Sequence, residues 1–266
     1  MPPSPNPYPD FALEERTYRG DTRPVFKQGE GPAVIVIHEV PGLHPRVAEF
    51  GRQVVRAGFT VYMPSLLGTP GKPFGLAYSL ASLARACVAR EFTMFATRQP
   101  SPITDWLRDL ARDAHEECGG PGVGAVGMCL TGGFALAMMA DERMLAPVLS
   151  QPSLPAALLP SQARDLGLDD ATLATVKARA AAGTCVMGLR FTGDAMVPKG
   201  RFDRLRAELG DAFIAVEIDS SPGNPHGIRR LAHSVLTIDL VDTPGHPTAQ
   251  ARDQVLDFLR ERLSPA

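Results

Sequence analysis

Four side chains able to take part in catalysis stand just beyond apolar segments of this sequence: Glu39, Cys129, Asp194 and His226. A thiol, an acid and an imidazole together can perform nucleophilic catalysis. The thiolate attacks an electrophilic carbon, the imidazole moves the protons, and the acid orients the imidazole. The sequence therefore predicts a covalent catalytic site, provided that the fold brings these groups together.

Cys129 lies in a turn of small residues, Gly127-Met-Cys-Leu-Thr-Gly-Gly133, between a predicted strand at Val123–Val126 and a predicted helix at Phe134–Asp141. This layout is typical of a nucleophile elbow, in which the reactive residue sits on a tight strand-to-helix turn. The helix N-terminus would favour the thiolate. The amide of Leu130 could stabilise a developing oxyanion. The turn therefore predicts Cys129 as the nucleophile.

The alternative for Cys129 is an ordinary buried cysteine, since free cysteine is among the most buried residue types. We assign that structural role to Cys87, Cys118 and Cys185, none of which follows a strand in a tight turn. The wide spacing of the four cysteines argues against a disulfide framework and against a zinc site. Reduced thiols of a cytoplasmic protein fit this usage best.

The acid and the histidine are expected after later strands. Asp194 follows a strand-like segment at Thr184–Thr192, although an aspartate there could instead cap the next helix. We prefer His226 as the histidine because it lies in a loop after the last strand, and His233 is the alternative. The order of nucleophile, acid and histidine matches that of α/β-hydrolases.

Glu39 ends the apolar segment Ala33–His38. A carboxylate in such a place is costly unless it is paired or exposed. Glu39 is thus a candidate partner for the thiol or for the histidine, and a solvated loop glutamate is the alternative.

Apolar, strand-like segments alternate with helical ones along most of the chain. This order predicts an α/β fold with a mostly parallel sheet flanked by helices on both faces. Function is then expected at the carboxyl ends of the strands. The predicted strands are Ala33–His38, Phe59–Met63, Val123–Val126, Pro147–Ser150, Thr184–Thr192 and Phe213–Ile218; the predicted helices are Arg46–Ala57, Ile103–Glu117, Phe134–Asp141, Asp169–Ala182, Phe202–Leu209 and Thr248–Leu263.

We expect one domain over residues 1–266, since α/β folds of this length routinely form a single unit. The segment Leu66–Pro102 has glycines, prolines and an apolar helical part but no strand pattern. It is predicted to be an excursion above the sheet and a possible partial lid.

The charge and the ends of the chain limit its partners. With 27 basic and 29 acidic side chains the formal charge is -2, and no basic face for nucleic acid is expected. Residues 1–10 lack the pattern of a signal peptide, and no apolar stretch is long enough to cross a bilayer. A cytoplasmic protein, monomeric or homodimeric, is therefore the expectation.

The sequence resembles the dienelactone hydrolase family from about Ala33 to its C-terminus. The motifs that carry the resemblance are His38-Glu39 with Pro41-Gly42, Gly127-Met-Cys129-Leu, Gly193-Asp194 with Val197-Pro198, and His226-Gly227. The resemblance implies a triad of Cys129, Asp194 and His226 that attacks an ester or lactone carbonyl and forms an acyl-enzyme without a metal or organic cofactor.

The resemblance also implies roles outside the triad. Glu39 would interact with the resting thiol, and the amides of Leu130 and Val40 would form the oxyanion hole. Arg230, four residues after His226, would bind a substrate carboxylate, with Arg229 as its rival.

The sequence departs from the family pattern in two places. Thr131 stands where the family usually has glycine and could crowd the elbow. A second carboxylate-binding arginine has no clear match, and only Arg85 and Arg90 are available.

The alternatives to an ester or lactone hydrolase are a thioesterase or acyltransferase with the same triad, and a non-catalytic binding protein of this fold.

Overall fold

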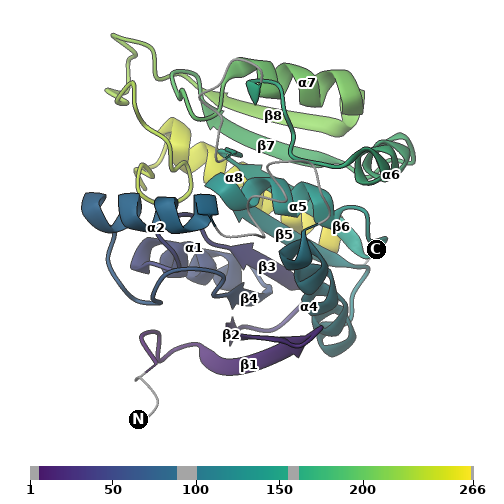
Figure 1. Cartoon of the computed structure of the whole chain (residues 1–266). Helices are drawn as coiled ribbons and strands as arrows, with labels where there is room; N and C mark the ends of the chain where they lie inside the picture. The colour runs from purple at the N-terminus through teal and green to yellow at the C-terminus, as the bar shows by residue number, and fades with distance from the viewer. Residues whose placement is uncertain (1–5, 89–100, 155–161, 265–266) are drawn as a thin grey trace.

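The protein is an α/β molecule built on an eight-stranded sheet (Figure 1). The computed structural model describes residues 6–88, 101–154 and 162–264. The strands lie in the order β1-β2-β4-β3-β5-β6-β7-β8. Neighbours from β4 to β8 pair in parallel, whereas β1 and β2 pair antiparallel at one edge. The predicted fold class is thereby confirmed.

The strands are β1 (Ala12–Tyr18), β2 (Asp21–Gln28), β3 (Ala33–Ile37), β4 (Thr60–Pro64), β5 (Val123–Met128), β6 (Met144–Ser150), β7 (Val186–Phe191) and β8 (Phe213–Ile218). The helices are α1 (Pro45–Arg56), α2 (Leu76–Val88), α4 (Pro102–Cys118), α5 (Gly132–Met138), α6 (Asp170–Ala181), α7 (Lys199–Leu209) and α8 (Pro247–Leu263).

Two apolar cores lie on the two faces of the sheet. One joins the sheet to α4, α5, α6 and α7, and Trp106 is its largest buried side chain. The other joins it to α1 and α8, with Phe50 and Phe258 among its members. Strands β3 to β7 are buried almost throughout, as expected of a parallel sheet covered on both faces.

The hairpin of β1 and β2 was not predicted. Its residues are mostly polar and partly exposed, because β1 forms an edge of the sheet. Long-range ion pairs stabilise this edge: Arg16 Nη1 lies 2.6 Å from Glu117 on α4, and Lys27 Nζ lies 2.7 Å from the same carboxylate. Such partners cannot be read from a local pattern.

The segment after β4 contacts residues that follow β3 in the sequence. The Leu66 amide donates to His38 Nε2 at 2.9 Å, and the ring of Phe74 packs edge-on against His44 at 6.2 Å between centroids. Helix α2 continues this segment. Residues 89–100 with Arg90, and the side chains of Arg85 and Cys87, lie outside the described residues.

Within the described residues, no helix has the length and apolar character that crossing a membrane requires. The same part of the chain holds no group of three or more side chains suited to bind a metal ion.

Candidate active site

Cys129 occupies the tight turn that the sequence predicted, directly after β5. It opens a single 3-10 turn (Cys129–Thr131) that runs into α5. Its φ of 56° lies in the left-handed region, which non-glycine residues rarely adopt and which recurs at functional sites. The side chain is buried, and its Sγ lies 3.1 Å from the Ser153 Oγ. The backbone thus places a buried thiol directly after the end of β5.

Thr131 closes this turn without crowding it. Its hydroxyl accepts the Met128 amide at 2.8 Å and lies 3.0 Å from the Ile37 carbonyl oxygen, to which it can donate. A Cβ on Gly127 would come within 2.3 Å of the Thr131 carbonyl oxygen. The threonine therefore ties the elbow to β3, and the close approach of backbone explains the glycine.

Asp194 lies beyond β7 and pairs with His233. Its Oδ2 accepts from His233 Nδ1 at 2.6 Å, and its Oδ1 accepts the Met196 amide at 2.9 Å. Both partners are largely shielded from solvent. An acid and an imidazole are thus brought together as predicted, but the histidine is His233 rather than His226.

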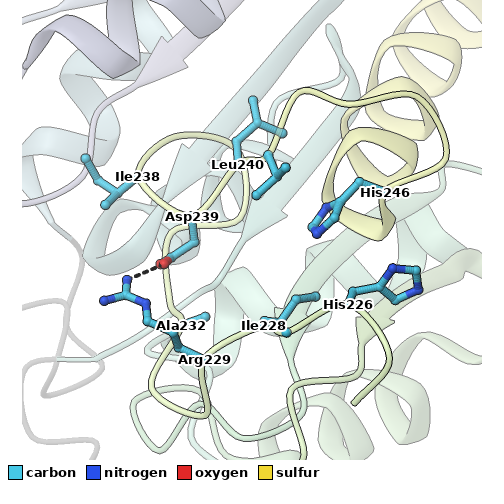
Figure 2. A pocket seen from close by; sticks show the side chains of 10 residues that line it. His226, Ile228, Arg229, Ala232, Ile238, Asp239, Leu240 and His246 are labelled. Atoms are coloured by element: carbon cyan, nitrogen blue, oxygen red, sulfur yellow. Dashed lines mark hydrogen bonds and ion pairs between the residues drawn. The ribbon is translucent and has the colours of Figure 1, made fainter. Parts of the chain in front are cut away.

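The preference for His226 as the partner of Asp194 is corrected by this geometry. His226 is exposed and its ring packs edge-on against His246 at 5.6 Å between centroids. It lines a surface pocket of about 250 Å³ together with Arg229 and Asp239 (Figure 2). The pocket lies beside the segment that carries His233 and does not include Cys129 or Asp194.

Local hydrogen bonds explain why the later histidine reaches the acid. Asn224 Oδ1 accepts the amides of His226 and Ile228, which closes a tight turn around His226. Asp239 accepts the amides of His233 and Ser234 at 2.9 and 3.1 Å, which fixes the second half of the segment. Proximity to the end of β8 was therefore a poor guide to which imidazole faces the site.

The charge of His233 is governed by its neighbours. Burial alone would lower the pKa of this imidazole, but the electrostatic interaction with Cys129 and the hydrogen bond to Asp194 outweigh burial and raise the pKa of His233 well above its ordinary value. Its Nε2 is buried and has no hydrogen-bond partner among the described residues. One ring nitrogen is thus held by the acid, and the other is available beside the thiol.

Glu39 is fully buried at the carboxyl end of β3, so the solvated alternative is excluded. Its carboxylate accepts from His44 Nε2 and Gln151 Nε2, each at 3.1 Å, from the Ser234 hydroxyl at 2.7 Å, and from the Thr237 hydroxyl. Burial raises the pKa of Glu39, but these hydrogen bonds, with that from His44 foremost, keep it below its ordinary value.

The predicted contact between Glu39 and the resting thiol is not observed: in the described part of the chain, Cys129 Sγ has no hydrogen bond to Glu39. The carboxylate instead holds the segment that follows His233. Four donors occupy it, and a carboxylate so engaged has little capacity left for a thiol.

Leu130, Val40 and Arg230 were predicted to act outside the triad. Leu130 is the second residue of the 3-10 turn, where amides lack partners within the helix, so it stays a prediction for the oxyanion hole together with partly buried Val40. Arg230 is exposed. Because His233 pairs with the acid, the residue four positions after the histidine is Thr237, and the spacing argument for Arg230 no longer holds.

Several residues around the site were missed by sequence reasoning: Ser153, Gln151, His44, Ser234 and Thr237. Gln151 directly follows β6 and Ser153 is the third residue after it, and polar residues after a buried strand are a signal that could have found them. Ser234 and Thr237 gave no such signal, because only the folded segment turns their hydroxyls toward Glu39.

Known proteins resemble this chain in sequence and in fold. The dienelactone hydrolase family model matches residues 22–262. A curated hydrolase fragment, YghX, from Escherichia coli (strain K12) is 36% identical over 65 residues. That match takes in 24% of this chain and 54% of the relative, so the chain spans about half the length of the curated protein it matches.

Solved structures share the fold at low sequence identity. One is a dienelactone hydrolase-like promiscuous phosphotriesterase from metagenomic libraries, with a TM-score of 0.63, 17% identity, and coverage of 96% of this chain and 98% of that one. Another, from Xanthomonas campestris, is described as an α/β serine hydrolase without a lid, with a TM-score of 0.58, 13% identity and 97% coverage of both chains. With the family model spanning nearly the whole sheet and its strand-end residues, the chain belongs to the dienelactone hydrolase family.

Proposed function

We propose that this protein hydrolyses carboxylic esters or lactones with Cys129 as nucleophile, His233 as proton carrier and Asp194 as the acid that orients the histidine. The observation that carries the proposal is the 2.6 Å hydrogen bond from His233 Nδ1 to Asp194, with the free Nε2 beside the Cys129 thiol. Three groups from separate strand ends in this arrangement form a nucleophilic triad.

Acylation begins from the thiolate and the imidazolium. The Cys129 sulfur attacks the carbonyl carbon, and the amides of Leu130 and Val40 stabilise the negative charge on its oxygen. The C–O bond to the leaving group then breaks, and His233 Nε2 gives its proton to the departing alkoxide. An alcohol leaves, or in a lactone the new hydroxyl remains attached, and a thioester to Cys129 remains.

Deacylation uses the same groups in reverse. His233, now neutral, takes a proton from water, and the resulting hydroxide attacks the thioester carbon. The C–S bond breaks, its electron pair returns to the sulfur, and the carboxylic acid is released. Asp194 fixes the imidazole tautomer in both steps and is itself unchanged.

Two histidine substitutions test whether His233 or His226 is the histidine of the triad. His233→Asn is expected to lower kcat on p-nitrophenyl esters by about 10³-fold or more, because it removes the proton carrier. His226→Asn, a matched change seven residues earlier, should leave kcat within about twofold, since His226 contacts His246 at the surface. The opposite ranking would overturn the assignment.

The nucleophile is tested separately. Cys129→Ala should abolish turnover, and mass spectrometry of the wild-type protein quenched during turnover should find the acyl group on Cys129. A fully active Cys129→Ala variant would refute the proposal. Adding competing alcohols or thiols distinguishes the alternative of an acyltransferase, because transfer products form only if water is not the sole acceptor.

A further inference from the structure

The hydroxyl of Ser153 lies against the sulfur of Cys129, at 3.1 Å between Oγ and Sγ. We propose that Ser153 is a further catalytic residue, whose hydroxyl donates a hydrogen bond to the Cys129 thiolate in the resting enzyme and again when the thiolate leaves the thioester. This inference rests on the proposed function, in which Cys129 is the nucleophile.

The position of Ser153 is set by backbone contacts rather than by its own side chain. Its amide donates to the Cys129 carbonyl oxygen at 3.0 Å. The preceding Pro152 packs on the elbow so closely that a Cβ on Gly132 would lie 2.9 Å from the Pro152 Cα. The chain after β6 is therefore held against the turn that carries the nucleophile.

Arg201 adds a second restraint on this strand end. The guanidinium is buried and donates to the Pro152 carbonyl oxygen at 2.8 Å and to the Asp165 carbonyl oxygen at 2.7 Å. Burial lowers the pKa of Arg201 to about 10, so the group remains charged at neutral pH. A fixed cation thus holds the backbone next to Ser153, which pre-organises the hydroxyl.

The Ser153 hydroxyl is a donor to the sulfur in addition to the His233 imidazole. Cys129 Sγ lies 3.1 Å from Ser153 Oγ and also interacts with the His233 imidazole, and among the described residues Sγ is the one hydrogen-bond partner of Ser153 Oγ. Both side chains are at most 4% exposed. A thiolate has no proton to give, so in the charged state the serine must donate. Glu39, the other expected partner of the thiol, is occupied by four donors.

The consequence is a larger thiolate fraction at a given pH and a better leaving sulfur in deacylation. Hydrogen bonds to charged groups are stronger than neutral ones, and burial strengthens them further. In both steps Ser153 keeps its proton and forms no covalent bond, so the acyl chemistry stays as described above.

The test measures the pH dependence of Cys129 alkylation by iodoacetamide, followed for each cysteine peptide by mass spectrometry. In Ser153→Ala the pH of half-maximal alkylation should rise by about one unit, which corresponds to about a tenfold smaller thiolate fraction below that pH. Ser153→Thr, which keeps the hydroxyl, should resemble the wild type, and its isostere Ser153→Val should resemble Ser153→Ala. Ser82→Ala, a buried serine of α2, is the control and should not shift the profile.

An unchanged alkylation profile in both Ser153→Ala and Ser153→Val would overturn this inference. So would a Ser153→Thr variant that shifts as far as Ser153→Val. Failure of the proposed function has a different signature, because it appears as undiminished turnover in Cys129→Ala. Alkylation reads the thiolate directly, so the two outcomes are separable.

Discussion

At the scale of single residues, the site is defined by which charges the fold buries together. Asp194 and His233 are joined by a 2.6 Å hydrogen bond. Both this bond and the interaction with Cys129 raise the pKa of the imidazole against the effect of burial. In a buried site such interactions are little screened by solvent. The His233 imidazole is therefore expected to carry a positive charge at neutral pH.

This charge state makes part of the folding stability depend on pH. The folded pKa of His233 is raised above its ordinary value of 6.5, so its contribution is fully present below pH 6.5 and is lost as pH rises through the folded value. The stability difference between wild type and His233→Gln, measured by urea unfolding, should shrink from pH 6 to pH 9. His226→Gln is the control and should show no such trend. A difference that grows with pH would contradict the assigned charge.

Glu39 makes a second prediction at this scale. Glu39→Gln replaces a carboxylate that accepts four hydrogen bonds by an amide that must also donate, so donors such as Thr237 lose a partner. We expect a loss of about 3 kcal/mol in the free energy of unfolding and a lower kcat, because the segment that carries His233 loosens.

The control and the pH dependence sharpen this expectation. Exposed Glu116→Gln should change stability by less than about 0.5 kcal/mol. The folded pKa of Glu39 is lowered, so its contribution is present above its ordinary value of 4.5 and is lost as pH falls through the folded value. Equal stability of Glu39→Gln and wild type at pH 7 would show that the network is not stabilising.

At the scale of elements, the elbow depends on the contact between β5 and the start of α5. Gly127→Ala would place a Cβ 2.3 Å from the Thr131 carbonyl oxygen, and a backbone atom cannot move aside cheaply. We expect a loss of about 3 kcal/mol in unfolding free energy and a marked fall in kcat, since the turn that holds Cys129 must shift.

Gly75→Ala is the matched control. Nothing lies within 4 Å of a Cβ at that position, and its φ is not in the left-handed region. Chemical denaturation should find it within about 1 kcal/mol of the wild type. If Gly127→Ala were equally harmless, the close backbone approach would not be what the turn requires.

Strands, helices and turns could be predicted from the sequence where their burial restricts the residue types of a short segment. Strand β3, Ala33–Ile37, was predicted as Ala33–His38, and the glycine-rich turn around Cys129 was also predicted, because a buried strand and a tight turn each restrict the residues they accept. The hairpin of β1 and β2 was missed because an edge strand is held by partners such as Glu117, which are distant in sequence.

At the scale of the whole molecule, the parallel sheet brings residues that are far apart in the sequence close together in space. Cys129 follows β5, Asp194 follows β7, and His233 lies between β8 and α8. The Glu39 carboxylate and the Ser234 hydroxyl are 195 residues apart in sequence and hydrogen-bonded. The carboxyl ends of parallel strands share one edge, so the site forms only when the sheet is complete.

Helix α8 closes that sheet on one face, and its burial tests how far stability belongs to the whole. Phe258→Ala should lower the free energy of unfolding by about 3 to 5 kcal/mol and the Tm by about 10 °C, because the side chain is fully buried against the sheet. kcat per folded molecule should be unchanged. Exposed Gln254→Ala on the same helix is the control, measured by the same thermal scan. A large loss of kcat in folded Phe258→Ala would show that α8 acts on the site.

The sequence alone determined the α/β class, the elbow and the identity of Cys129 and Asp194 as strand-end residues, because each follows from local pattern and strand order. The tertiary structure decided the partners. His233 rather than His226 meets the acid, Glu39 holds the segment after His233 rather than the thiol, and Ser153 reaches the sulfur. Those contacts join segments whose approach depends on how loops fold over the sheet, and no short-range pattern encodes that approach.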